Sequence, residues 1–169
     1  MRNFILGIVI TLVVLALGAY LYVWGGHAPV ATNAKPMPFE TTLAKKALNA
    51  RVHKEMPTIV PIAADAATFQ AGAQVYKTQC GECHGLPGQP DSDDATSMFP
   101  PPPQLFHGQG VSDDPAGETY WKVTNGIRLS GMPSFRTMLS DTERWQVSVM
   151  LAHSNELPPA VMQVLQAHH

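Results

Sequence analysis

Hydrophobic positions are distributed unevenly along the 169-residue chain. Residues 4–24 contain no charged side chain, whereas every later apolar stretch is short. As a helix, this segment rises about 31 Å at roughly 1.5 Å per residue, which matches a hydrocarbon core of about 30 Å. The pattern predicts a single transmembrane helix, and residues 1–25 are assigned to a transmembrane signal anchor.

A cleavable signal peptide is the alternative interpretation of this segment. Arg2 supplies a charged start, and residues 16–18, Ala-Leu-Gly, resemble a cleavage site. The apolar run is longer than the roughly 7 to 15 residues of a signal peptide, and it continues through aromatic residues that suit a membrane interface. We therefore favour an uncleaved anchor. No Lys or Arg follows Arg2 before Lys35, which favours an amino terminus inside and the remaining chain outside.

The next stretch, residues 26–62, is predicted to be a linker. Glycines and prolines within residues 25–39 break regular structure there. A helix is expected at residues 41–55, capped by Thr41 or Thr42 and carrying a modest apolar face. It is expected to lie on the domain or on the membrane.

Residues 63–169 form the predicted domain, and their hydrophobic spacing is helical. Helices are expected at about 65–78, 118–126 and 140–154, with a last one after Pro158. The third begins with a capping box of Ser140 and Glu143. Residues 86–116 are rich in proline and are expected to form an irregular loop. Since no alternating pattern is long enough for a sheet, the predicted fold class is all-α.

Charge separates the linker from the domain. From residue 61 onward, five Lys and Arg face eleven Asp and Glu, a net charge of −6, whereas residues 25–60 hold five basic and two acidic residues, or +3. The simplest interpretation is solubility. A sharper one places the basic segment near anionic lipid headgroups and the acidic domain against a basic partner.

Both cysteines of the chain fall in one short motif, Cys80-Gly81-Glu82-Cys83-His84. The Cys-x-x-Cys-His pattern is typical of c-type haem attachment. Each thiol adds to one vinyl group of the haem, and the adjacent imidazole reaches the iron. The motif therefore predicts one covalent haem c, held by Cys80 and Cys83 with His84 as an axial ligand.

Two other interpretations of the cysteine pair are a redox disulfide and a zinc site. The chain lacks the βαβ pattern that accompanies thioredoxin-type motifs. Zinc usually has four protein ligands in a structural site, and no second Cys-x-x-Cys or Cys-x-x-His pair is present to complete them. An extracytoplasmic domain also agrees with haem attachment, which takes place outside the bacterial cytoplasmic membrane.

A second run, residues 125–135 (Asn-Gly-Ile-Arg-Leu-Ser-Gly-Met-Pro-Ser-Phe), lies before the 140–154 helix. With the haem motif, it makes residues 65–154 resemble the class I cytochrome c family, specifically the small, membrane-anchored, monohaem bacterial type. That family has an all-α fold and presents its axial methionine in a Gly-Met-Pro context. The resemblance implies that Met132 is the second axial ligand, and His/Met ligation raises the reduction potential.

His107 is the alternative ligand, because it follows the proline run in a loop and imidazole binds iron well. Four other methionines are interpreted as packing residues, since methionine more often fills gaps than binds iron. They are Met98, Met138, Met150 and Met162.

The resemblance also implies a helix crossing. In the family, a glycine placed like Gly72, with Tyr76 one turn later, lets the last helix cross closely, and Trp145 matches an aromatic of that helix. A tyrosine often found five residues after the aromatic is Met150 here, so looser packing is expected. These residues are expected to build the pocket.

The same family holds the ligating imidazole through a proline carbonyl, which orients the ring. For His84, the candidates are Pro87 or the run Pro101, Pro102 and Pro103, and we favour the run.

Tyr120, Trp121 and Arg128 lie near the methionine loop. They either contact the haem propionates or are ordinary surface residues.

The predicted function is single-haem electron transfer with fixed His/Met ligation, at the outer face of the bacterial inner membrane. The domain is expected to be periplasmic and to exchange electrons with a redox donor and acceptor, with no nucleic-acid partner. One alternative is a haem subunit of a larger dehydrogenase or oxidase complex. Another is a peroxidase or gas sensor, which would require an open or labile position on the iron.

Overall fold

The computed structural model describes residues 1–106 and 111–167. Throughout these residues the regular structure is helical and no strand occurs. The chain divides into two compact units, Met1–Thr41 and Thr42–His169. The predicted all-α class is therefore confirmed.

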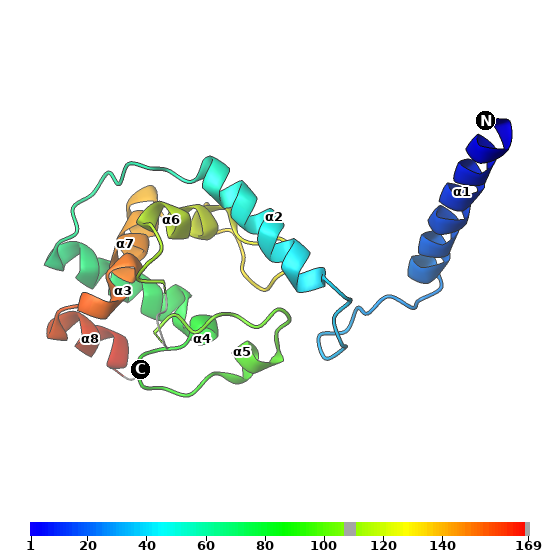
Figure 1. The fold of residues 1–169 in the computed structure, drawn as a ribbon. Helices are drawn as coiled ribbons and strands as arrows, with labels where there is room; N and C mark the ends of the chain where they lie inside the picture. Colours follow the sequence, from blue (N-terminus) through cyan, green and yellow to red (C-terminus); the bar gives the residue numbers. More distant parts are fainter. Residues whose placement is uncertain (107–110, 168–169) are drawn as a thin grey trace. The chain divides into compact units, whose positions relative to one another are not determined.

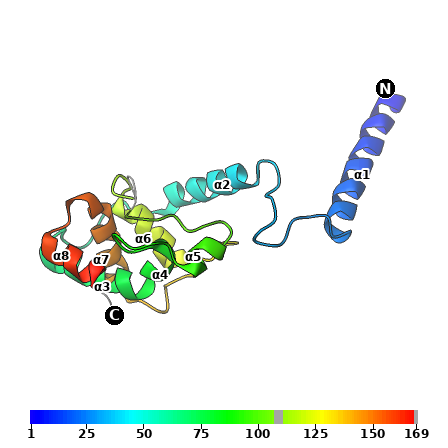
Figure 2. The same ribbon diagram turned by 90° about the horizontal axis from the view of Figure 1, so that it is seen from below.

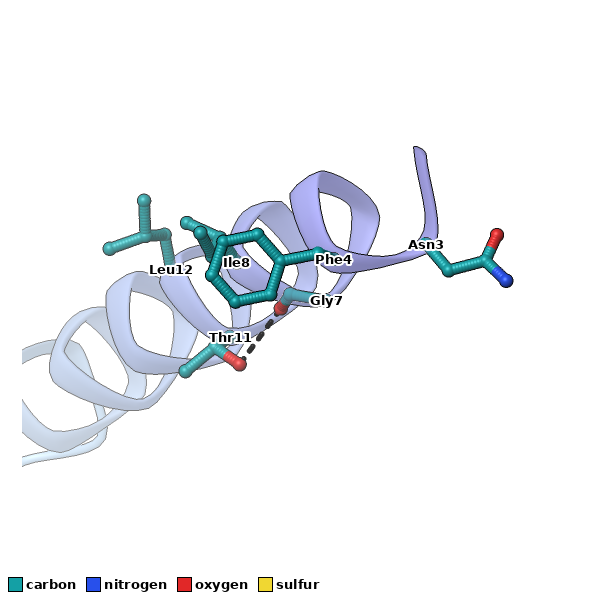
Figure 3. A pocket seen from close by; sticks show the side chains of 6 residues that line it. All are labelled: Asn3, Phe4, Gly7, Ile8, Thr11 and Leu12. Atoms are coloured by element: carbon teal, nitrogen blue, oxygen red, sulfur yellow. Dashed lines mark hydrogen bonds between the residues drawn. The ribbon is translucent and has the colours of Figure 1, made fainter. Parts of the chain in front are cut away.

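The first unit contains the helix α1, Arg2–Trp24, which is long and apolar enough to cross a membrane. Its most apolar window has a mean hydropathy of 2.7, and none of that window is buried. Figure 3 shows the residues that line an open pocket on the surface of this helix, among them Phe4, Gly7 and Leu12. The Thr11 hydroxyl donates to the Gly7 carbonyl at 2.9 Å, so this polar group is satisfied within the apolar helix.

The second unit is a bundle of short helices (Figure 1). Helix α3 packs against α7 and α8, and α6 also packs against α7. Figure 2 shows the same helices from below, with α3, α7 and α8 still side by side. The elements of this bundle are α3 (Ala66–Gln79), α4 (Gly81–His84), α5 (Asp93–Ser97), α6 (Ala116–Asn125), α7 (Asp141–Ala152), the 3-10 turn Ser154–Glu156 and α8 (Pro159–Gln166).

Side-chain caps determine where the helices begin. Asp65 accepts a hydrogen bond from the Thr68 amide at 2.8 Å and starts α3. Ser140 and Glu143 form the predicted capping box of α7. Ser92 caps α5, a short helix inside the stretch predicted to be irregular loop. That prediction was wrong at this point because a Ser-Asp-Asp start stabilises one helical turn despite the surrounding prolines.

The crossing of α3 and α7 is tight rather than loose. Met150 is fully buried, and a Cβ added to Gly72 would lie 2.8 Å from the Met150 Cβ. Tyr76 and Trp145 are also buried in the same core. The expectation of looser packing at Met150 was therefore wrong, because the flexible methionine fills the space completely.

Helix α2, Glu40–Glu55, is docked on the bundle at its carboxyl end. Val52 is 1% exposed, and the Trp121 indole N–H donates to the Glu55 carboxylate at 3.2 Å. The backbone of Pro57 contacts Gly117 so closely that a Cβ on this glycine would clash with it. The end of the predicted linker is thus held on α6.

Candidate functional site

The motif residues lie at the junction of α3 and α4. Cys80 ends α3 with its amide donating to the Tyr76 carbonyl, and it is also the N-cap of α4. The amides of Cys83 and His84 both donate to the Cys80 carbonyl, at 3.2 and 2.9 Å. A single turn therefore presents both thiols and the imidazole.

Both thiols stay protonated at neutral pH. Burial raises the pKa of Cys80 to about 12, with a further contribution from Cys83. Burial also raises the pKa of Cys83, aided by the carboxylates of Asp94 and Glu82. Redox-active Cys-x-x-Cys pairs instead have a nucleophilic cysteine with a pKa lowered to roughly 3.5–7.5. The electrostatics of this pair therefore do not favour the disulfide-exchange interpretation.

The zinc interpretation also gains no support from the structure. Across residues 1–106 and 111–167, no three His, Cys, Asp or Glu side chains are grouped so as to hold a metal ion. The local chemistry offers two neutral thiols and one imidazole.

The imidazole of His84 has a defined orientation. Its Nδ1 lies 2.8 Å from the carbonyl oxygen of Pro103, and since a carbonyl only accepts, Nδ1 carries the proton. Burial lowers the pKa of His84, opposed by the hydrogen bond to Pro103. The ring is thus neutral with an Nε2 lone pair free for a ligand, and the carbonyl comes from the proline run rather than from Pro87.

Other residues hold the backbone around His84. The buried Tyr76 hydroxyl lies 2.8 Å from the carbonyl oxygen of Gly85 and 3.1 Å from that of His84. The Leu105 amide also donates to the His84 carbonyl, and the Gln104 side chain donates to the Cys83 carbonyl at 3.3 Å. The exit from α4 is therefore fixed by α3 on one side and by the proline run on the other.

Met132 lies in a turn closed by its own hydrogen bonds. The Ile127 amide donates to the Met132 carbonyl at 3.1 Å, and the Met132 amide donates to the Ser130 hydroxyl at 3.2 Å. Gly126 allows the turn to begin, because its φ of +68° favours glycine. The Met132 side chain is half-buried against the core that also contacts Cys80.

The other methionines have separate positions. Met98 lies under the turn, since its sulfur is 2.7 Å from where a Cβ on Gly131 would be. Met150 is in the core, Met162 is half-buried against it, and Met138 is 54% exposed. His107 lies outside the described residues.

Sequence reasoning alone missed Gln104 and Met98 as neighbours of the site. Gln104 follows the proline run directly, but a single glutamine in a loop carries no pattern that identifies its partner. Met98 was expected only to fill a gap in the packing. Its contact with residue 131 joins distant parts of the chain, and no local sequence pattern indicates such a contact.

The three residues considered for haem propionates have different surroundings. Tyr120 stacks on Trp145 with ring centroids 4.0 Å apart and donates to Asp141 at 2.5 Å. Trp121 donates to Glu55. Arg128 is exposed. Two of the three therefore already have protein partners that explain their positions.

The donor set fits an iron porphyrin. A neutral imidazole with an anchored Nδ1, a thioether in an ordered turn and two protonated thiols are the groups that would supply two axial ligands and two attachment points. Zinc is bound by cysteine, histidine and carboxylate side chains, and a thioether sulfur is too soft a donor for magnesium.

Comparisons with known proteins give one family match and a structural likeness. The family model described as cytochrome C oxidase, cbb3-type, subunit III matches residues 67–149, which include both the cysteine motif and Met132. A chain from the reducing HAO-like protein complex of Kuenenia stuttgartiensis is similar with 24% identity and a TM-score of 0.48, covering 70% of this chain. The match spans half the length of that chain. Among curated proteins, no sequence matches.

Proposed function

We propose that this chain carries a c-type cytochrome domain and acts as a single-haem electron carrier anchored in a membrane. The family model that matches residues 67–149 supports the domain assignment. Cys80 and Cys83 would hold the haem through two thioether bonds. His84 and Met132 would be the axial ligands of its iron.

The observation that carries the site assignment is the hydrogen bond from His84 Nδ1 to the Pro103 carbonyl. It leaves Nε2 as the ligand atom and prevents the ring from rotating. A hydrogen bond from the other ring nitrogen of a ligating imidazole orients the ring and also makes the ligating nitrogen more basic. The Tyr76 hydroxyl supports the same segment through two carbonyls.

The protein's contribution to electron transfer is rigidity. When bound, the haem supplies an iron that accepts and releases one electron. His84 and Met132 keep the same positions in both oxidation states because the Pro103 carbonyl and the Ser130 turn hold them. Little reorganisation is then needed, and no substrate pocket is required.

For the location, the proposal is a single pass of α1 through a bacterial inner membrane, with the domain in the periplasm. Support comes from the length and hydropathy of α1 and from the single Arg2 before it. A periplasmic domain would also lie on the side of the membrane where c-type haem is attached.

A second candidate function is a haem subunit within a larger oxidase or dehydrogenase complex. It is favoured by the family model, whose description is that of an oxidase subunit. In both cases the chain transfers electrons, but only a subunit has a constant partner. The donor and the acceptor would then be neighbouring redox groups of the same assembly.

The test of the site uses the full-length chain expressed with a c-type haem attachment system. Wild type should show one haem per chain and a haem-stained band after denaturing electrophoresis, and Cys80→Ala/Cys83→Ala should show none. The weak red absorption band of a ferric iron bound to methionine sulfur should disappear in Met132→Ala. Its absence in wild type would refute this ligand pair and favour an open-site peroxidase or sensor.

A second experiment separates the carrier from the subunit. The native protein is extracted in mild detergent and captured by an affinity tag. A redox partner present in a fixed one-to-one ratio would support the subunit, and isolation of the haem protein alone would support the carrier.

A further inference from the structure

Among residues 42–106 and 111–167, the amino-terminal part of α2 has no partner in the bundle. Residues 42–47, 49 and 50 are all exposed, and within α2 only Glu40, Leu48 and Val52 are even partly covered. The contacts that hold α2 come from its last turn and from the residues that follow it. About two and a half turns of helix therefore project from the docking point with every side open to solvent.

The side of α2 that faces away from the bundle has a distinct composition. At 100° per residue, residues 40, 43, 46, 47, 50 and 54 lie opposite the buried Val52. Glu40 is half-buried and accepts a hydrogen bond from the Met37 amide, whereas the other five form an exposed set. We call this set the outward face: Leu43, Lys46, Ala47, Ala50 and Lys54. All five are exposed, and Leu43 retains 70% of its surface.

The outward face places two lysines beside apolar side chains. Lys46 and Lys54 lie beside Leu43, Ala47 and Ala50, and their long side chains reach headgroup phosphates while their methylene groups cover apolar surface. Arg51 is engaged with Glu55 at 2.8 Å and so belongs to the side of the helix near the docking point.

Charge indicates which surface this face would meet. Residues 25–60 have a net charge of +3, and the chain from residue 61 onward has −6. An anionic surface therefore attracts α2 and repels the rest of the domain. A helix of this length is also marginal alone in water, so a partner that covers it would stabilise it.

The chain length between α1 and α2 keeps the two near the same membrane. Fifteen residues, 25–39, join them, and fully extended they reach about 50 Å at the maximum of roughly 3.3–3.6 Å per residue. Since this tether is short, the concentration of α2 near the lipid surface is high even when its affinity for lipid is weak.

We propose that the outward face of α2 binds anionic lipid headgroups of the membrane that α1 crosses. This inference rests on the membrane anchoring in the proposed function. Because the bond from Trp121 to Glu55 and the contact of Pro57 with Gly117 join the end of α2 to α6, lipid binding also orients the haem domain relative to the membrane surface.

The test measures amide hydrogen exchange in the full-length haem protein, reconstituted at one copy per lipid nanodisc. One set of discs is neutral phosphatidylcholine, and the other contains phosphatidylglycerol. Amides of residues 42–50 should exchange at least tenfold more slowly in the anionic discs. Lys46→Gln/Lys54→Gln should lose this protection. The control Lys45→Gln/Lys77→Gln removes the same charge away from the outward face and should keep it.

Three results would overturn the proposal while leaving the anchor intact. The first is that the amides of residues 42–50 are not protected in either lipid, and the second is that they are equally protected in both. The third is that the two double variants lose this protection equally. Protection that appears only in discs with two copies would identify a second chain as the occupant. Release of wild-type protein from vesicles by alkaline carbonate would instead refute the anchoring by α1, and the present proposal with it.

Discussion

The Nδ1 atom of His84 lies 2.8 Å from the carbonyl oxygen of Pro103, nineteen residues later in the chain. The next residue, Gln104, donates to the Cys83 carbonyl, and the amide of Leu105 donates to the His84 carbonyl. Three consecutive residues thus hold two residues of the cysteine motif. The proline run stiffens this loop because each proline has a restricted φ.

Tyr76→Phe is expected to destabilise the backbone around the ligand. The hydroxyl is buried and serves two carbonyls, and in the described part of the chain only that of His84 has another donor, the Leu105 amide. Loss of the bond to Gly85 should lower the free energy of unfolding by about 1–2 kcal/mol. Chemical denaturation followed by circular dichroism measures this change in the free energy of unfolding. The control Tyr120→Phe removes a hydroxyl from an exposed pair and should cost less, so an equal loss would contradict the role assigned to Tyr76.

Met98→Ala is expected to loosen the turn that carries Met132. The Met98 sulfur packs against Gly131, so truncation leaves a gap beneath the turn. The methionine-to-iron band should persist at low temperature but disappear at a lower denaturant concentration than in wild type. The free energy of unfolding should fall by about 1–2 kcal/mol, because the side chain is half-buried. Met138→Ala is the matched control, because Met138 is largely exposed. An unchanged midpoint in Met98→Ala would show that the turn does not depend on this contact.

Gly72→Ala is expected to force α3 and α7 apart. The new Cβ would lie 2.8 Å from both the backbone carbon of Gln146 and the Cβ of Met150, and neither can move without shifting α7. Overpacking should cost about 1–3 kcal/mol, more than the roughly 1 kcal/mol by which alanine favours a helix. The unfolding midpoint of this variant is compared with that of Gln74→Ala, on the exposed side of the same helix. A stabilised Gly72→Ala would refute the tight crossing.

Acid should destabilise the domain partly through Asp141. Hydrogen bonds from Tyr120 and then Arg144 lower the pKa of this carboxyl. A carboxyl whose pKa is lower in the folded state than in the unfolded state stabilises the fold at pH values above the unfolded-state pKa. This stabilisation is lost as the pH falls through the folded-state pKa. Unfolding midpoints measured from about pH 5 to pH 2 should therefore fall less steeply in Asp141→Asn than in wild type. Asp91→Asn, in a loop, serves as the control, and equal slopes in all three proteins would contradict the prediction.

Trp121→Phe is expected to loosen the docking of α2. The indole N–H is the donor to Glu55, and phenylalanine keeps the ring but not the donor. Hydrogen exchange at residues 51–57 should become faster, with a cost of about 0.5–1.5 kcal/mol. Exchange within α7 should remain unchanged, and faster exchange throughout the domain would indicate general unfolding instead.

Local patterns were sufficient for much of the fold. Caps such as Asp65 and the box of Ser140 and Glu143 act within four residues, so the sequence predicted where α3 and α7 begin. The apolar run of α1 and the spacing of Cys80, Cys83 and His84 are likewise contiguous. Each depends on residues that are neighbours in the chain, and the structure places them as the patterns indicated.

Long-range contacts could not be predicted in the same way. The sequence left Pro87 and three later prolines as candidates for the carbonyl beside His84, and only the path of the loop selected Pro103. The position of Met98 under Gly131 and the docking of α2 on α6 also join residues far apart in the chain. Such contacts depend on how whole elements pack, because the free energy of each is small and the path of the chain decides which surfaces meet. By itself, the sequence therefore determined the chemistry of the haem motif and the helical class, whereas the tertiary structure decided what holds that motif in place.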